Sequence, residues 1–89
     1  MKRLEIHVSG IVQGISFRAA TQQVAQHLGI NGYAKNEADG SVTIIAEGEE
    51  AKLQSLLDWA TRGPDVARVD TITHLWLKPC GLFDHFSTL

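Results

Sequence analysis

Apolar and polar residues alternate with a period of two along three stretches of the chain, and this alternation predicts half-buried β-strands. The first stretch is Leu4–Ser9, the second is Ile30–Asn36 and the third is Val42–Ala46. The dipeptide Asp39-Gly40, between the second and the third, is a hairpin turn signal. Ile45 points away from the alternating apolar residues of the third strand, which indicates that its second face is partly covered.

Two further stretches have the three-to-four-residue spacing of amphipathic helices. The first runs from Phe17 to Leu28, with Ser16 as its N-cap and Gly29 as its stop signal. The second begins at the acidic pair Glu49-Glu50, whose charge suits a helix N-terminus, and ends before Gly63-Pro64. Its apolar stripe consists of Leu53, Leu56, Leu57 and Ala60.

The remaining apolar residues predict the last part of the fold. Those between Val66 and Leu77 mark a long fourth strand, and we expect a β-bulge there because the alternation slips. Phe83 and Phe86 are compatible with a short fifth strand at the sheet edge. The order β-α-β-β-α-β predicts an α+β, ferredoxin-like fold, an antiparallel sheet with two helices on one face.

This topology brings two distant segments together. A right-handed crossover makes the first two strands parallel, with the third antiparallel between them. The ends of the first and second strands therefore lie at the same edge of the sheet. We expect the segment Gly10–Arg18 to lie near Asn36 for this reason.

Length and charge limit the classes of function. The 89 residues are enough for one domain with a small core, spanning residues 1–89. A net charge of −2 argues against nucleic-acid binding. The acids are unevenly spread, because none lies between Glu5 and Glu37, a span that contains Arg18 and Lys35. That distribution favours a local anion site on a mildly acidic protein.

Cysteine usage and hydropathy suggest the compartment. The single Cys80 cannot form an internal disulfide, and we interpret it as structural or incidental. No cysteine pair suggests a zinc site, and no apolar run is long enough to span a membrane. We expect a cytoplasmic protein without a membrane partner, and a monomer is the default oligomeric state.

The segment Gly10–Arg18 carries the strongest chemical signal. Gly10 and Gly14 allow tight turns that expose backbone N–H groups, and such groups at a helix N-terminus bind anions. Arg18 lies in the first helical turn, where the helix dipole disfavours a cation. A residue that opposes its own helix often marks a functional site. We interpret the segment as a seat for phosphate or a similar oxyanion.

Three residues near this segment have two readings each. His7 is either a solvent-facing strand residue or a general base. Phe17 is either a core residue or a substrate contact. Asn36 is either an ordinary strand-end residue or part of the site, and the turn that follows it is already explained by Asp39-Gly40.

Three ordered motifs run through the chain, and their residues are Gly10-x-Val12-Gln13-Gly14-Ile15-x-Phe17-Arg18, then Gly29-Ile30-x-Gly32-Tyr33-x-x-Asn36-x-x-Asp39-Gly40-x-Val42, then Gly63-Pro64-x-x-Ala67-x-Val69. Together they resemble the acylphosphatase family, and the resemblance covers Leu4 to Leu77. Tyr33 stands where many relatives have Trp. Thr88 stands where a larger aliphatic residue is usual, which leaves the pairing of the last strand open.

The resemblance implies hydrolysis of an acyl phosphate to a carboxylate and inorganic phosphate, without metal or cofactor. It implies that Arg18 binds the phosphate and that Asn36 orients the attacking water. It also implies a cradle of backbone N–H groups, made by Gln13, Gly14, Ile15, Ser16, Phe17 and Arg18. An amide side chain suits the task at position 36, because it can hold a water without titrating.

Two alternatives remain. The first is a non-catalytic module of the same fold that binds phosphate or acyl phosphate. Such a domain occurs in hydrogenase-maturation carbamoyltransferases, where Pro-Phe typically follows the arginine, whereas Ala19-Ala20 follow it here. The second is RNA binding, which needs aromatic residues on the central strands. The stretches Leu4–Ser9 and Ser41–Glu47 contain no aromatic residue.

Overall fold

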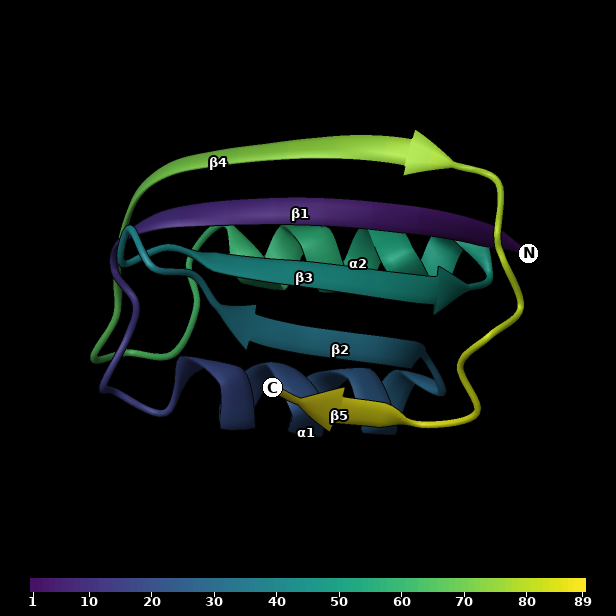
Figure 1. Ribbon diagram of the computed structural model, residues 1–89, viewed down its shortest axis with the longest axis horizontal. Helices are drawn as coiled ribbons and strands as arrows, with labels where there is room; N and C mark the ends of the chain where they lie inside the picture. Colours follow the sequence, from purple (N-terminus) through teal and green to yellow (C-terminus); the bar gives the residue numbers. More distant parts are fainter.

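The computed structural model describes residues 1–89 and contains two helices and five strands, and all five strands belong to one sheet (Figure 1). The strands lie side by side in the order β4-β1-β3-β2-β5. The elements in chain order are β1 (Lys2–Ile11), α1 (Phe17–Leu28), β2 (Asn31–Asn36), β3 (Val42–Gly48), α2 (Glu50–Ala60), β4 (Arg68–Leu77) and β5 (Phe86–Thr88).

The sheet confirms the predicted ferredoxin-like topology. β3 lies between β1 and β2 and runs antiparallel to both, so β1 and β2 are parallel to each other. Val42, at the start of β3, is opposite both Val8 and Asn36. The last β1 residue paired with β3 and the last residue of β2 therefore flank Val42, so the two strands end at the same edge, as the crossover rule predicted. β5 pairs with β2 in parallel, so the sheet is mixed at this edge instead of antiparallel throughout.

Both helices cover one face of the sheet (Figure 1). α1 packs on β2 and β5, and α2 packs on β1 and β3. The predicted stripe of α2 is buried, and Leu53 and Leu56 are fully enclosed. Burying a leucine side chain stabilises the fold by about 1.5–3 kcal/mol. In α1 the buried positions are Phe17, Thr21 and Ala25, whereas Val24 and Leu28, which the helical spacing also places on this side, are half-buried.

The expected bulge lies in the pairing of β4 with β1. Ser9 is opposite Thr71 and Gly10 is opposite Val69, which leaves Asp70 as the extra residue on β4. Gly10 has a φ of 134°, and a Cβ there would lie 2.1 Å from the oxygen of Arg68. Only glycine fits this close approach of two backbones.

The apolar residues of β4 are not all core residues. Val66 lies before the strand and is exposed, and Leu75 and Leu77 are exposed on the sheet face away from the helices. The core side of this edge strand is formed by half-buried Val69, Ile72 and Trp76.

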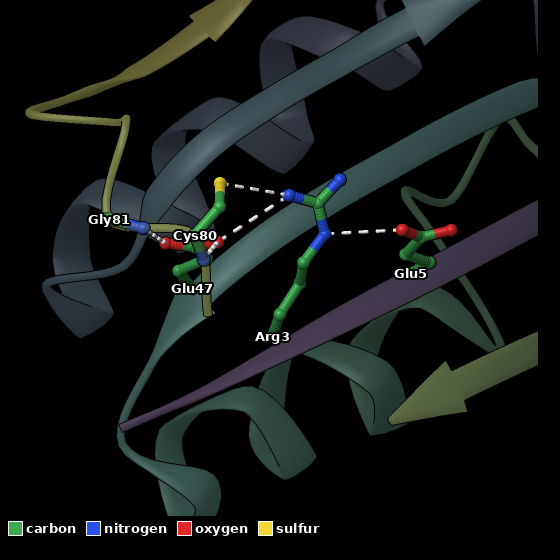
Figure 2. A network of polar contacts seen from close by, with 5 residues as sticks. All are labelled: Arg3, Glu5, Glu47, Cys80 and Gly81. Carbon is green, nitrogen blue, oxygen red and sulfur yellow. Dashed lines mark hydrogen bonds and ion pairs between the residues drawn. The ribbon is translucent and has the colours of Figure 1, made fainter. Parts of the chain in front are cut away.

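The chain after β4 runs past the end of the sheet where β1 begins and β3 ends (Figure 1), and it contacts side chains on the sheet face away from the helices. The buried carboxylate of Glu47 accepts hydrogen bonds from the N–H groups of Cys80, at 2.8 Å, and Gly81, at 3.1 Å (Figure 2). Arg3 Nη1 lies 3.5 Å from the same carboxylate and donates to Cys80 Sγ at 3.1 Å. Phe83 then packs edge-on against Tyr33, with ring centroids 5.8 Å apart. Ile45, on this face, is only 4% exposed, which confirms that the face is partly covered.

This segment delivers β5 to the far edge of the sheet. Phe86 is buried, whereas Phe83 lies outside the strand. The tail continues past β5, since the N–H of Leu89 donates to the oxygen of Ala34 at 2.8 Å. Neither helix is long and apolar enough to cross a membrane.

Candidate active site

The loop between β1 and α1 presents free backbone N–H groups. None of the N–H groups of residues 13–16 donates to another part of the main chain. The first N–H groups of α1 lack partners as well, as at any helix N-terminus. Such a row of donors, at the positive end of a helix dipole, favours an anion.

The loop contains two residues in the left-handed conformation, separated by Ile15. Gly14 has a φ of 76°, and Ser16 has a φ of 64° and a ψ of 26°. The left-handed conformation costs a non-glycine residue about 1–2 kcal/mol. Ser16 occupies the predicted N-cap position, but its side chain makes no capping hydrogen bond. Strain of this kind clusters at functional sites.

Arg18 lies in the first turn of α1, which contains no acidic residue. Its side chain is half-buried, and Nη1 donates to the main-chain oxygen of Leu89. A guanidinium has five N–H donors in one plane, so Nε and Nη2 keep their donors for a ligand. The contact with Leu89 thus fixes one side of the group and leaves another available.

Asn36 ends β2 at the same end of the sheet as this loop (Figure 1). Its side-chain oxygen, Oδ1, is buried and has no hydrogen-bond donor in the protein. It is the only buried side-chain polar atom without a partner. Leaving such an atom without a partner costs about 1–3 kcal/mol, so a group of this kind needs an explanation in terms of a ligand or water.

One hollow of about 340 Å³ lies between the loop and Asn36. Its lining brings Arg18 and Asn36 together, as the topology predicted. It contains no acidic residue, and the guanidinium is its only charged group. The residues that line it are Val12, Gly14, Ser16, Phe17, Arg18, Ala19, Gln22, Asn36 and Thr88.

The other candidate residues lie in different positions. Gln13 and Ile15 belong to the loop but do not line the hollow, and Ile15 packs against the core. Phe17 is 1% exposed and packs on Trp59 with ring centroids 5.6 Å apart, which makes it a core residue beneath the hollow. His7 is exposed on the face away from the helices and does not line the hollow, so the structure gives no support for a general base there.

Sequence reasoning missed Gln22 and Thr88. Gln22 is a polar residue of α1 outside its apolar stripe, and its Nε2 donates to the oxygen of Phe86 at 2.9 Å. This bond holds β5 against the helix and brings Thr88 into the lining. No local pattern in the sequence signals a contact between these segments. No group of three or more histidine, cysteine, aspartate or glutamate residues is arranged to hold a metal ion.

Comparisons with known proteins agree with this geometry. A family model described as acylphosphatase matches residues 4–88. An acylphosphatase from an Anaeromyxobacter species is 49% identical over 76 residues, 85% of this chain and 82% of that protein. The crystal structure of acylphosphatase from Bacillus subtilis is 34% identical, with a TM-score of 0.95, and the match covers 100% of this chain and 99% of that one.

A match of a different kind is HypF from T. kodakarensis, which is 32% identical with a TM-score of 0.85. All of this chain matches there, but it spans only 12% of that chain. The family model covers nearly the whole sequence and agrees with the relatives of comparable length. The chain therefore belongs to the acylphosphatase family.

Proposed function

We propose that the chain hydrolyses acyl phosphates, which are carboxyl–phosphate anhydrides, to a carboxylate and inorganic phosphate in the hollow between the β1–α1 loop and Asn36. The observation that carries this proposal is the shared lining. A guanidinium, a helix N-terminus with free N–H groups and an asparagine whose buried amide oxygen has no partner surround one hollow.

Arg18 and the loop hold the phosphoryl group in this proposal. The N–H groups of residues 13–18 and the free donors of Arg18 surround its oxygens. Fixed donors stabilise the charge of the transition state without reorganising, and they act more strongly where water is excluded. Phosphoryl transfer depends mostly on such positioning and charge stabilisation.

Asn36 holds the attacking water. The water oxygen forms a bond to phosphorus while the bond between phosphorus and the acyl oxygen breaks. The bonding electron pair leaves with the carboxylate, and the proton of the water passes to the phosphate oxygens. Because carboxylic acids have pKa values near 4, this leaving group needs no general acid. The absence of an acidic residue from the lining is consistent with this mechanism.

The proposal also covers the partners, the oligomeric state and the compartment of the protein. The substrate is a small acyl phosphate, and neither nucleic acid nor membrane takes part. We propose a monomer in the cytoplasm. The single cysteine supports the compartment, because it cannot form an internal disulfide. In this proposal Arg18 and the loop contact the phosphate and Asn36 contacts the water, and none of them binds the acyl group. We therefore expect the enzyme to accept many acyl groups.

Phosphate release from benzoyl phosphate tests the function. We expect turnover by the wild-type protein, retained after dialysis against EDTA, because charge stabilisation rests on Arg18 and the backbone. A loss of activity that magnesium restores would contradict that assignment. A protein that binds phosphate but releases none from the substrate would instead be the non-catalytic module of the same fold.

A further inference from the structure

The side chain of Gln13 connects the two segments that form the hollow. Its amide nitrogen, Nε2, donates to the oxygen of Glu37 at 2.7 Å and to the oxygen of Ser41 at 2.9 Å. Both acceptors belong to the β2–β3 turn, and Glu37 directly follows Asn36. Gln13 directly precedes Gly14, which lines the hollow. The amide therefore spans from one wall of the hollow to the other without lining it.

No other side-chain hydrogen bond joins this loop to the turn. The loop main chain between residues 13 and 16 makes no backbone hydrogen bond through its N–H groups. Val12 and Ile15 pack the loop against the apolar core and make no hydrogen bond to the turn. The two bonds of Gln13 are therefore the direct polar contacts between the loop and the turn, in addition to the pairing of β1 and β2 with β3.

The turn is a rigid partner for this contact. The N–H of Glu37 donates to the oxygen of Ser41 at 2.8 Å, and Asp39 Oδ1 accepts from the N–H of Ser41 at 2.9 Å. Thr43 Oγ1 donates to Glu37 Oε2 at 2.6 Å. These bonds hold the backbone that follows Asn36, so the loop is tied to a segment that does not depend on it.

We propose that Gln13 is a positioning residue that sets the separation between the phosphate cradle and Asn36. The role rests on the proposed hydrolysis, in which the cradle holds the phosphorus and Asn36 holds the water. In-line attack needs these two groups in one geometry, and a displacement of about 1 Å can reduce a rate by about 10²-fold. Phosphate itself contacts only the cradle and Arg18, so its binding does not depend on the connection.

A merely structural role would have a different signature. The oxygen of Glu37 also accepts from the N–H of Gly40 at 3.2 Å, and the oxygen of Ser41 accepts from the N–H of Glu37. Removing the Gln13 amide therefore leaves neither carbonyl without a partner. We expect little loss of stability and a large loss of turnover, which separates positioning from folding.

The test compares Gln13→Met, which keeps the shape of the side chain, with Gln13→Glu, which is isosteric but places carboxylate oxygens against two carbonyl oxygens. The matched control is Gln26→Met, an exposed glutamine on α1 that makes no side-chain hydrogen bond. The measurements are kcat and KM for benzoyl phosphate, inhibition by inorganic phosphate, and the urea midpoint. We expect kcat to fall about tenfold or more in Gln13→Met and further in Gln13→Glu. Phosphate inhibition and the urea midpoint should stay near the wild-type values.

A double-mutant cycle with Asn36→Ala completes the test. If Gln13 acts by aligning the cradle with Asn36, Gln13→Met should cost little once the amide of Asn36 is gone. Equal losses in both backgrounds, an unchanged kcat, or a parallel loss of phosphate affinity would each overturn the role. Failure of the hydrolytic function has its own signature, since the wild-type protein would then release no phosphate at all.

Discussion

Arg18 and Leu89 are joined by a hydrogen bond from the guanidinium Nη1 to the main-chain oxygen, across 71 positions of sequence. The oxygen is held in place, because the N–H of Leu89 donates to Ala34 in β2. The tail after β5 therefore orients the arginine that faces the hollow. The guanidinium keeps Nε and Nη2 for the ligand, which is the arrangement that a bidentate contact requires.

A lysine cannot reproduce that arrangement. We expect Arg18→Lys to lose nearly as much activity as Arg18→Ala, about 10²–10³-fold, because a point charge replaces two parallel donors. The measurement is phosphate release from benzoyl phosphate, with circular dichroism to verify the fold. The matched control is Arg62→Lys, at an exposed arginine beyond the end of α2, which should retain full activity. Substantial turnover by Arg18→Lys would contradict a bidentate role.

Asn36 should affect turnover and not phosphate binding. Asn36→Ala removes the group proposed to hold the water, so we expect kcat to fall about 10²-fold or more. Inhibition by inorganic phosphate should barely change, since the phosphate contacts the loop and Arg18. Gln26→Ala, at an exposed amide on α1, serves as the control. If phosphate affinity falls strongly in Asn36→Ala, this residue belongs to the phosphate site instead.

The fold could be predicted from the sequence, and so could the proximity of the β1–α1 loop to the end of β2, because both depend on periodicity and topology. Alternation gave the strands, and the crossover rule placed the end of β1 beside the end of β2, which brings Arg18 to Asn36. The left-handed conformation of Ser16 could not be predicted, because a serine before a helix usually signals a capping side chain.

Contacts across many residues were also beyond sequence reasoning. The bonds from Gln13 to Glu37 and Ser41, and from Gln22 to Phe86, join segments that have no local pattern in common. The parallel pairing of β5 depends on the segment that Glu47 holds against the sheet. Each of these contacts is set by packing in three dimensions, which neither propensity nor spacing encodes.

Glu47 predicts how stability depends on pH. Its burial works to raise the pKa, but hydrogen bonds from the backbone of Cys80 and Gly81, together with the charge of Arg3, outweigh it and hold the pKa below its ordinary value. A depressed pKa means that the stabilisation is fully present above the unfolded-state pKa, near 4.3, and is lost as pH falls through the folded-state value.

We therefore expect Glu47→Gln to destabilise the protein at pH 7 by about 1–3 kcal/mol, because the amide replaces one of the two accepting oxygens with an NH2 donor and leaves one backbone N–H without an acceptor. The difference from wild type should shrink steadily below about pH 4. Urea unfolding between pH 3 and pH 7 measures both, with Asp65→Asn as a control that removes one negative charge at an exposed position outside the helices and strands. A difference that stays constant over this range would show that the charge of Glu47 does not stabilise the segment after β4.

The last prediction concerns the cost of placing Arg18 at a helix N-terminus. A cation in this position is disfavoured by the helix dipole, and the free N–H groups of the loop add to the positive potential. The hydrogen bond to Leu89 is at an exposed position and offsets part of that cost. Without ligand, Arg18→Gln should leave the protein equally stable or stabilise it by about 0.3–1 kcal/mol.

With phosphate present, the wild-type protein should instead be more stable than Arg18→Gln. A ligand that binds only the native state stabilises it by RT ln(1 + [L]/Kd), and Arg18→Gln should lose most of that contribution because its affinity falls. The measurement is urea unfolding of both proteins at low salt, with phosphate and with chloride at matched ionic strength. The chloride arm separates binding from general screening, which weakens the dipole effect in both proteins. A strong destabilisation of the empty protein by Arg18→Gln would show that the bond to Leu89 is the main role of Arg18, and the phosphate site would lose its physical basis.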